Sequence, residues 1–309
     1  MSARTPPLPQ PSAVAVVIVA YRPTPAIVRC LEAACAQAGR VIVVDNTPDD
    51  SSEALFAGLA TRLPFERLAV GANIGQAAGL NRGFARAAEL GLPFVLTLDQ
   101  DSVPRPDLLA RLCAIWRQLP AGRPAAVLGA NYQAEIQGRT KLGFADAAGR
   151  GAFFENVTAI TSGSLTPLAA FDDIGPFREE FFIDHVDHDW CLRARAKGYG
   201  IYIASEPLLT HVIGAVSYHR VLGKTLETSN HSAARRYFWH RNGAVLVREY
   251  LRREPDWCLK LALFHFPAAL LTMTLFEHGK PAKLAAVARG LWDGLRRDFG
   301  RNPILKSGN

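Results

Sequence analysis

The sequence predicts an α/β fold with a mostly parallel central sheet and a helical extension at the carboxyl-terminal end. Short β-branched apolar runs alternate with amphipathic helical stretches from Val14 to about residue 130. Several of these runs end in polar residues, as strands do at the carboxyl edge of an open sheet. From about Ser217 onward the pattern is helical and basic. Right-handed crossovers between such units build one parallel sheet.

Each element is predicted from its apolar pattern and its end signals. Val14–Val19 is almost wholly apolar and β-branched, as a central parallel strand is. Thr24 followed by Pro25 is typical of a helix start. The expected elements are, in order, strand 14–19, a helix from Thr24, strand 41–44, helix 51–63, strand 67–70, helix 76–90, strand 94–98, helix 106–118, strand 125–129, a loop or loose hairpin over 133–152, strand 157–161, and strands 201–204 and 208–210.

Charge and composition divide the chain unevenly. Residues 1–12 are rich in Pro and Ser and are predicted to be a disordered lead. We expect an α/β domain over 13–216 and a helical, basic region over 217–309. Residues 219–309 hold 16 Lys and Arg against 7 Asp and Glu, whereas residues 1–218 hold 19 against 21. The excess positive charge therefore predicts an anionic partner for the tail: a membrane surface, a lipid diphosphate or nucleic acid.

The five cysteines are scattered and form no CxxC pair, so they predict neither a disulfide framework nor a zinc site. Reduced thiols fit a cytoplasmic chain. The Pro-rich start has no apolar core of the kind that a secretory signal needs, which agrees with that location.

The stretch Phe94 to Ser102 carries the first candidate site. Its apolar run ends in Asp99 and Asp101, which flank Gln100. Alternation along an extended chain sends the two carboxylates to one side. Two such oxygen ligands suit Mg²⁺ or Mn²⁺ holding a substrate diphosphate. A turn with an Asx cap is the alternative, since Asp, Ser and Pro also favour turns.

Two other polar features follow predicted strands. Asp45 stands just past a buried strand, where it can accept hydrogen bonds from a nucleobase or ribose, or cap a turn. Asn73 precedes a helix on which Gly75, Gly79 and Gly83 share one face. That stripe lets a ligand or another backbone approach closely, and close packing on the sheet is the alternative. Asn73 would cap this helix or meet a diphosphate.

An acidic stretch supplies a candidate general base. Asp184 and Asp187 share a face if the segment is helical, and Asp189 and Arg193 follow them. Like charges raise a carboxylate pKa, which favours a base, although a solvated, capped helix start explains the same spacing. His211 follows a short apolar segment; it is either a packed or surface histidine or a further metal ligand.

The tail has two informative parts. Residues 235–242 mix cations and aromatics, which suits phosphate or sugar, or equally a helix whose Arg side chains extend over the core. The apolar run Leu261–Phe276 is shorter than the roughly 20 residues of a membrane span. With the basic residues that follow, it predicts a helix in a membrane interface over 257–301; a core or dimer helix is the alternative.

In this order, the pieces resemble an inverting GT-A glycosyltransferase of family 2 over about 13–215, and bacterial rhamnosyltransferases in particular. The pieces that carry the resemblance are Ala20-Tyr21-Arg22, Asp45-Asn46, the helix Asn73 to Gly83, Asp99-Gln100-Asp101, Ser162-Gly163-Ser164, and the segment Phe181 to Arg193. The resemblance implies a Rossmann-like nucleotide-sugar-binding fold.

The resemblance also implies a role for each candidate residue. Asp187 would be the general base, with Asp184, Asp189 and Arg193 in support, and Asp101 with His211 would hold Mg²⁺ or Mn²⁺. The family's usual Glu-Asp pair is here Val186-Asp187, so Asp184 or Asp189 is a substitute base. The residues expected to bind the nucleotide sugar are Ala20, Tyr21, Arg22, Asp45, Asn73, Gly75, Gly79, Asp99, Gln100 and Gly163.

The function implied is metal-dependent transfer of a sugar, L-rhamnose from dTDP-rhamnose, to a glycan or lipid-linked acceptor in bacterial surface-polysaccharide synthesis. A UDP-sugar donor, a nucleotidyltransferase and a scaffold that has lost catalysis are the alternatives. A nucleotidyltransferase would carry a Gly-rich, basic loop after the first strand, where this chain has Tyr-Arg-Pro-Thr. No nucleic-acid partner is expected, and a homodimer is left open.

Overall fold

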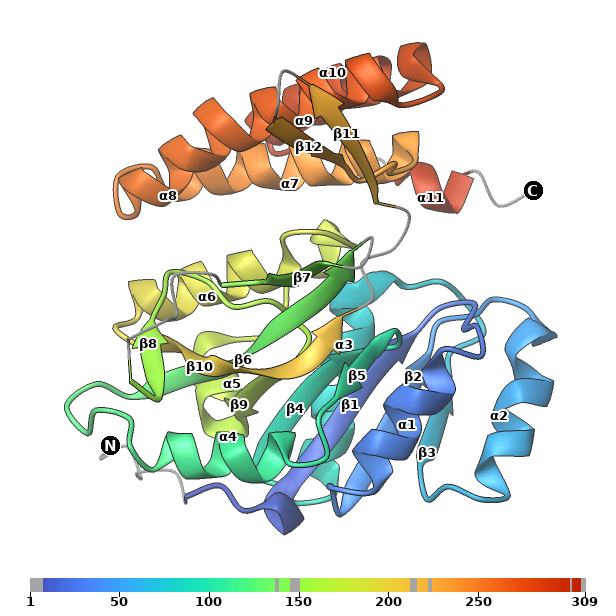
Figure 1. The fold of residues 1–309 in the computed structure, drawn as a ribbon, viewed down its shortest axis with the longest axis vertical. Helices are drawn as coiled ribbons and strands as arrows, with labels where there is room; N and C mark the ends of the chain where they lie inside the picture. Colours follow the sequence, from blue (N-terminus) through green and yellow to red (C-terminus); the bar gives the residue numbers. More distant parts are fainter. Residues whose placement is uncertain are drawn as a thin grey trace. The chain divides into compact units, whose positions relative to one another are not determined.

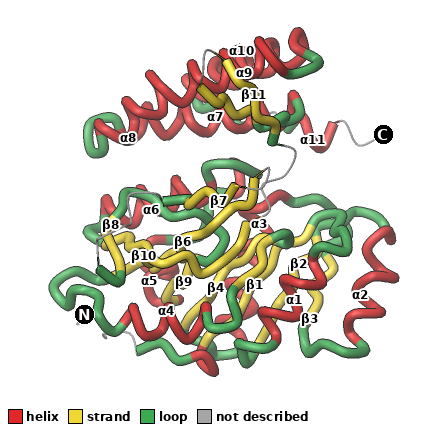
Figure 2. Tube along the Cα trace, in the orientation of Figure 1, coloured by secondary structure: helices red, strands yellow, loops and turns green. Residues whose placement is uncertain are grey.

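The computed structural model describes residues 8–136, 139–144, 151–211, 216–221, 224–300 and 302–306 (Figure 1). The chain forms two compact units: Met1–Glu179 with Trp190–Val212, and Glu180–Asp189 with Ile213–Asn309. The first unit contains a ten-stranded sheet between helices, and the second contains helices and a two-stranded hairpin (Figure 2).

The sheet of the first unit has the strand order β3-β2-β1-β4-β9-β6-β10-β5, with β7 beside β6 and β8 beside β10. Parallel pairs join β1 to β2 and β4, β2 to β3, and β6 to β10, which confirms the mostly parallel sheet. β9 runs antiparallel between β4 and β6. The strands are β1 Val14–Ala20, β2 Arg40–Asp45, β3 Glu66–Ala69, β4 Phe94–Asp99, β5 Ser102–Pro104, β6 Ala125–Ile136, β7 Arg139–Leu142, β8 Phe153–Glu155, β9 Ser164–Pro167 and β10 Gly200–His211.

Helices cover both faces of this sheet. Val14, Val16 and Ile18 of β1 pack into one buried cluster with side chains of α1 and α4, which lie on the near face in Figure 1. Alternate residues of β1 point to the opposite face, where α3 lies. The helices are α1 Ile27–Cys35, α2 Glu53–Ala60, α3 Gly75–Glu89, α4 Leu108–Trp116, α5 Leu168–Ile174 and α6 Val186–Ala196.

The glycine stripe of α3 is explained mainly by close packing on β1. A Cβ on Gly79 would come 2.8 Å from Val19 Cγ1, and a Cβ on Gly83 would overlap Val17 Cγ1. Only a residue without a side chain lets the helix approach the strand this closely. Gly75 has a φ of 85°, so glycine suits this position because of its backbone conformation and not because of packing. The packing alternative therefore accounts for two of the three glycines.

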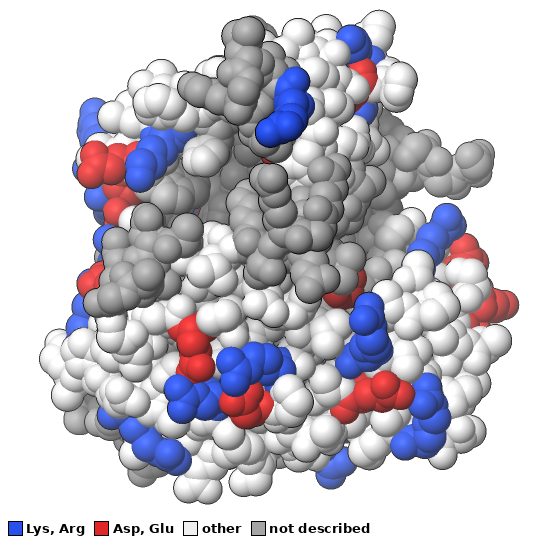
Figure 3. Space-filling view, viewed as in Figure 1, with Lys and Arg blue, Asp and Glu red and all other residues white. Residues whose placement is uncertain are grey.

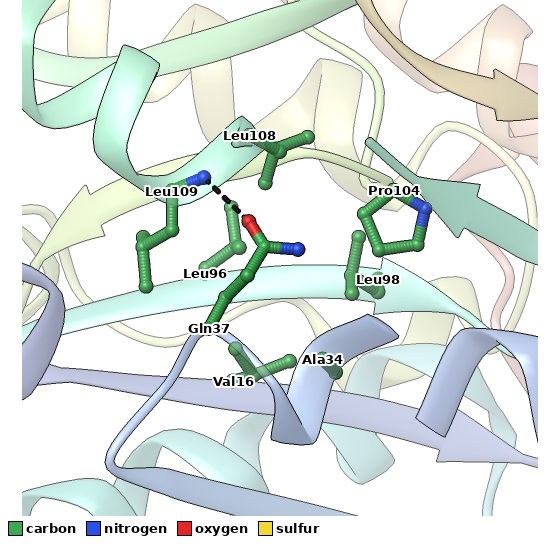
Figure 4. A pocket seen from close by; sticks show the side chains of 8 residues that line it. All are labelled: Val16, Ala34, Gln37, Leu96, Leu98, Pro104, Leu108 and Leu109. Atoms are coloured by element: carbon green, nitrogen blue, oxygen red, sulfur yellow. Dashed lines mark hydrogen bonds between the residues drawn. The ribbon is translucent and has the colours of Figure 1, made fainter. Parts of the chain in front are cut away.

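A small apolar pocket lies between α1, α4 and the sheet (Figure 4). Gln37 supplies its one polar side chain, and Gln37 Oε1 accepts a hydrogen bond of 3.0 Å from the backbone N–H of Leu109. Val16, Leu96 and Leu98 line the opposite wall. This pocket contains none of the predicted site residues, so it is a packing feature between helices and sheet.

Charges on the visible face of the first unit are interspersed in sign (Figure 3). The ion pairs Arg105–Asp107, at 2.9 Å, and Arg111–Glu206, at 2.5 Å, are examples from this unit. Such pairing agrees with the near balance of charge before residue 219. Surface pairs of this kind add little stability, about 0–1 kcal/mol each.

The second unit is built around helix α7, Ala233–Tyr250, with α10, Lys280–Arg296, packed along it. Gly290 of α10 lies against the backbone of Tyr237, where a Cβ would come 2.5 Å from the carbonyl oxygen. The remaining elements are β11 Ser217–Val221, β12 Lys224–Thr228, α8 Pro255–Lys260, a π-helix Leu261–His265, α9 Phe266–Phe276 and α11 Pro303–Lys306.

A buried ionic group joins these helices. Arg236 and Lys283 both contact the Glu277 carboxylate, at 2.5 and 2.7 Å, and the side chain of Glu277 has no solvent exposure. Burial acts to raise the Glu277 pKa, but the bonds and charges of Lys283 and Arg236 lower it overall. Glu277 is therefore ionised, and removing either partner would leave a buried charge with less compensation.

Several sequence predictions about elements are wrong. Residues 157–161 are irregular rather than a strand; the strand is β9, after Gly163. The two late strands are one strand, β10, with register shifts between Ile203 and Pro207 where the polar residues suggested a break. β11 and β12 form a hairpin within the stretch predicted to be helical. Residues 1–7 of the predicted disordered lead lie outside the described residues, and Pro11–Ala13 at its end is a 3-10 helix.

The segment predicted as a loop or loose hairpin is partly a hairpin. β6 extends to Ile136 and pairs with β7 in antiparallel register, Gln133 opposite Leu142. Residues 145–150 of the same prediction lie outside the described residues. All five cysteines are described and are free thiols.

Candidate functional site

The carboxyl ends of three parallel strands bring the predicted polar residues of the first unit together. In the strand register, Ala20 lies opposite Asp45 and Val19 lies opposite Asp99. The N–H of Asn46 donates to the carbonyl of Ala20 at 2.7 Å, which ties the turns after β1 and β2. Open α/β sheets bind ligands at this edge.

Two hydrogen bonds between the Gln100 side chain and the Tyr21 backbone join the turn after β4 to the turn after β1. We call this pair of bonds the clasp. The Tyr21 N–H donates to Gln100 Oε1 at 3.0 Å, and Gln100 Nε2 donates to the Tyr21 carbonyl at 3.3 Å. Next along the chain, Arg22 has a φ of 44°, and its N–H donates to Thr47 Oγ1 at 3.0 Å. Tyr21 is 41% exposed, so its ring is accessible for stacking.

Asp45 is buried, with 1% exposure, and both of its carboxylate oxygens accept hydrogen bonds. Oδ1 accepts from the N–H of Thr47 at 3.0 Å; Oδ2 accepts from Ser52 Oγ at 2.7 Å and Arg67 Nε at 3.0 Å. Burial acts to raise the Asp45 pKa, but these hydrogen bonds lower it overall. Asp45 thus orders the turn after β2, and its contact with a nucleotide stays a prediction.

Asn73 and Asn46 organise the start of α3. Asn73 Oδ1 accepts from the N–H of Gly75 at 3.1 Å, so Asn73 caps the turn before the helix. Asn46 Nδ2 donates to the carbonyl of Gly75 at 2.8 Å. Asn46 was part of the resemblance but was not among the predicted ligand contacts. The roles of Asn73, Gly75 and Gly79 toward a donor stay predictions.

Asp99 and Asp101 share the neighbourhood of one buried thiol. Cys30 of α1 donates from Sγ to the carbonyl of Asp99 at 3.5 Å. Burial, and then the charges of both carboxylates, raise the Cys30 pKa. The contact with the Asp99 carbonyl places Cys30 beside the end of β4.

Two serines support this acidic turn: Ser102 of β5, and Ser162 in the turn before β9. Ser162 Oγ accepts from the N–H of Asp99 at 3.2 Å and donates to Ser102 Oγ at 2.7 Å. Gly163, with a φ of 81°, donates its N–H to the carbonyl of Thr97 at 2.7 Å. A Cβ on Gly163 would lie 2.7 Å from Ala130 Cβ, so this position needs glycine for both reasons.

The end of β10 lies beside the same turn. The backbone of His211 pairs with Ser102, the residue after Asp101. The side chain of His211 lies outside the described residues. Among the described residues, no group of three His, Cys, Asp or Glu side chains is arranged to hold a metal ion by itself. Two carboxylates fit Mg²⁺ or Mn²⁺ only when substrate phosphate and water supply other ligands.

In the second unit, the acidic stretch forms the start of α6. Asp187 lies in the first turn, and its Oδ1 accepts from the N–H of His188 at 2.8 Å. Asp189 has no solvent exposure. The Asp184 side chain is 10% exposed and pairs with Arg235 at 3.0 Å. Burial raises the Asp184 pKa despite that cation, with the Asp187 charge adding to the effect.

The backbone before Asp187 is strained. Phe182, Asp184 and His185 have φ values of 61–63°, in the left-handed region that disfavours side chains other than glycine. Three such residues within four positions cost about 1 kcal/mol or more each. Other contacts of this unit must therefore hold the segment in place.

Asn242 and Arg241 of α7 supply those contacts. Asn242 Nδ2 lies 2.9 Å from each of the carbonyl oxygens of Phe181, Ile183 and Asp184. Its Oδ1 accepts from Arg241 Nε at 2.9 Å, and Arg241 also donates to the carbonyl of Glu180. Both side chains are fully buried, which makes this cluster a rigid support for the segment that leads to Asp187. We call Arg241 and Asn242 the α7 clamp.

Arg193, predicted as a supporting residue, lies farther along α6 in the first unit. Its guanidinium donates to the carbonyl oxygens of Ile174 at 3.2 Å and Pro176 at 2.8 Å. Trp190 Nε1 donates to the carbonyl of Gly175, between them, at 2.9 Å. These bonds fix the turn after α5, so Arg193 has a structural task there.

Comparison with known proteins shows which family the first unit resembles. Residues 15–153 match the family described as Glycosyl transferase family 2. The dTDP-rhamnosyl transferase RfbF of Shigella flexneri is 28% identical over 216 residues, covering 68% of this chain and 71% of that protein. The recognised resemblance to family 2 glycosyltransferases and their rhamnosyltransferases is confirmed.

Solved structures support the fold. S. aureus TarS 1–349 in complex with UDP-GlcNAc has a TM-score of 0.60 at 14% identity, covering 93% of this chain and 88% of that chain. A longer TarS structure has a TM-score of 0.55 at 15% identity, and the match spans 86% of this chain but only 44% of that chain. These likenesses confirm the GT-A type of α/β fold.

Proposed function

The chain carries a glycosyltransferase family 2 domain, and on that premise we propose that it is a metal-dependent, inverting rhamnosyltransferase. The donor is dTDP-rhamnose, and the acceptor is a glycan or lipid-linked glycan of a surface polysaccharide, handled in the cytoplasm. The supporting observation is the place of Asp99 and Asp101 at the carboxyl end of β4, which lies in parallel register beside β1 within the segment that matches the family.

The donor would lie at the strand ends. Tyr21 stacks on or beside the base, and the clasp with Gln100 keeps the turn after β1 in one conformation. Asp101, with His211, would hold Mg²⁺ or Mn²⁺, which would neutralise charge on the leaving nucleoside diphosphate, and Asp99 would lie near the ribose. The hydroxyl of Ser162 orients the backbone of Asp99.

Asp187 is the proposed base. Its carboxylate takes the proton of an acceptor hydroxyl, whose oxygen forms the new bond to the anomeric carbon. The bond from that carbon to the diphosphate oxygen breaks on the opposite side, so one displacement inverts the centre. The N–H of His188 donates to Asp187 Oδ1 at 2.8 Å, which orients the carboxylate at the start of α6.

The base assignment is tested with Asp187→Asn. This variant should lose transfer while its donor affinity stays within a few-fold of wild type, because the amide keeps the shape but takes no proton. Asp172→Asn, which changes an exposed carboxylate on α5, is the control and should keep full turnover. Full residual turnover in Asp187→Asn rejects Asp187 as the base.

The metal assignment is tested with Asp101→Ala. Donor affinity in wild type should fall on chelation and return with Mg²⁺ or Mn²⁺, whereas the variant should bind weakly in both conditions. A wild-type binding curve that is indifferent to chelator rejects the metal site but leaves the base assignment standing.

A UDP-sugar donor is the second candidate, because the TarS structure named above contains UDP-GlcNAc. Thermal stabilisation by dTDP-rhamnose and by UDP-sugars, each with Mn²⁺, separates the two. A bound donor raises the melting temperature according to its concentration relative to its dissociation constant. Stabilisation by UDP-sugars alone would replace the rhamnose donor.

A further inference from the structure

The second unit exposes an unusually apolar helix surface. α8, the π-helix and α9 form one continuous run of 22 residues, Pro255–Phe276. Its most apolar 18-residue window has a mean hydropathy of 1.6, and 17% of the residues of that window are buried. The run thus begins earlier than the apolar stretch predicted from the sequence. We call its large exposed side chains the outer stripe: Leu259, Leu263, Phe264, Leu270, Leu271 and Leu275.

The opposite side of the same run is packed inside the unit. Cys258 and Met273 have no solvent exposure. The Phe266 ring lies 5.1 Å from the Trp239 ring and 5.2 Å from the His240 ring of α7. This packing ties the helix to α7, which contains fully buried charged and polar side chains such as Arg241. The side of the helix that carries the outer stripe is the side exposed to solvent.

Cations flank the outer stripe at both ends. Arg252 and Arg253 are exposed just before the run, Lys260 is exposed within its first turns, and Lys280 is exposed just after it. Among the described residues, none of these four side chains forms an ion pair, so they are available to an anionic partner. Each such cation contributes about 1 kcal/mol of attraction to an anionic membrane surface.

The charge pattern distinguishes a membrane from a second copy of the chain. A symmetric dimer through the outer stripe would bring the cationic ends of one copy against cationic ends of the other. Like charges at those places oppose association. An anionic lipid surface matches both the cations and the apolar side chains between them.

From this geometry we propose that the outer stripe lies in the interface of a membrane that contains anionic lipid, with the helix parallel to the surface. The leucines and Phe264 contact the acyl boundary while Arg252, Arg253, Lys260 and Lys280 contact lipid phosphates. The helix does not span the bilayer, because its inner side is occupied by α7.

The test uses the full chain and sedimentation with unilamellar vesicles of phosphatidylcholine, with or without phosphatidylglycerol, in the absence of donor and acceptor. Wild type should bind the anionic vesicles more tightly, and added salt should weaken the binding. The combined variant Leu263→Gln, Phe264→Gln and Leu271→Gln should lose affinity by about tenfold or more. Leu8→Gln, at a leucine of the first unit with 59% exposure, should bind as wild type does.

A charge-reversal variant tests the contacts with lipid phosphates, and a carbonate wash tests how deeply the helix inserts. Arg252→Glu with Lys260→Glu should weaken binding to anionic vesicles and leave little salt dependence. Bound wild type should be released by alkaline carbonate, as a surface-bound helix is. Thermal melts of every variant should match wild type, which shows that the second unit is folded; all substituted side chains are exposed.

Three results would overturn the proposal. Wild type that stays in solution with anionic vesicles at low salt shows that the stripe does not bind lipid. Resistance to carbonate shows a spanning helix instead. A dimer in size-exclusion chromatography that the triple glutamine variant dissociates, together with no vesicle binding, shows that a second copy covers the stripe.

Discussion

Asn242→Ala is the substitution that most directly tests how the segment leading to Asp187 is held. The side-chain amide nitrogen of Asn242 carries two N–H donors. It lies 2.9 Å from each of three backbone carbonyl oxygens, which share these donors. Alanine removes both bonds and leaves carbonyls in a buried place without this donor, at about 1–3 kcal/mol each. The left-handed residues would also be freed to relax. We therefore expect a loss of about 3 kcal/mol in the free energy of unfolding.

Urea titration followed by circular dichroism measures that loss, and Asn156→Ala is the matched control. Asn156 Nδ2 donates one part-buried hydrogen bond, to the carbonyl of Thr158 at 2.8 Å, so its loss should cost about 1 kcal/mol. Under conditions where both variants are folded, Asn242→Ala should lower kcat and leave donor affinity unchanged. A change in unfolding free energy below about 0.5 kcal/mol would refute the reasoning about the α7 clamp.

Two further predictions concern packing and acid stability. Gly83→Ala should destabilise the protein by about 1–2 kcal/mol, because the overlap with Val17 outweighs the gain in helix propensity. The control Gly58→Ala, on the open surface of α2, should instead stabilise the protein by up to about 1 kcal/mol. Equal changes in unfolding free energy for the two variants in urea titration would reject the packing explanation. Burial lowers the pKa of His231 to about 3 and of His240 to about 4, so each takes up a proton on unfolding between pH 6.5 and those values. Stability should therefore fall as the pH drops below 6.5, by up to about 1.4 kcal/mol per pH unit for each, and stability independent of pH from 6.5 to 5 would contradict these burials.

The first half of the fold follows closely from local sequence pattern. Strands β1, β2 and β4 begin within a residue or so of the predicted positions, because uninterrupted apolar runs such as Val14–Val19 have few other uses. The strand ends were predictable for the same reason, and the registers bring Ala20, Asp45 and Asp99 to one edge. The family resemblance, carried by these stretches, was confirmed by comparison.

The later elements depend on partners that local pattern does not reveal. β9 has four residues and lies between β4 and β6, far away in the sequence, so nothing in Ser164–Pro167 alone marks it as a central strand. β10 continues through Ser205, Glu206 and Pro207 because β6 pairs with it on both sides of the irregularity. Tertiary pairing here outweighs the residues that usually end strands.

The same limit applies to the charges of the tail. Counted from the sequence, residues 219–309 present an excess of cations for an outside partner. In the structure, Arg236 and Arg241 are buried, one against Glu277 and the other against backbone carbonyls. These two cations stabilise the interior of the second unit, whereas Arg252, Arg253, Lys260 and Lys280 are exposed around the helix Pro255–Phe276. Net charge alone suggested an anionic partner, but only burial shows which arginines are free to meet it and which hold the segment before Asp187.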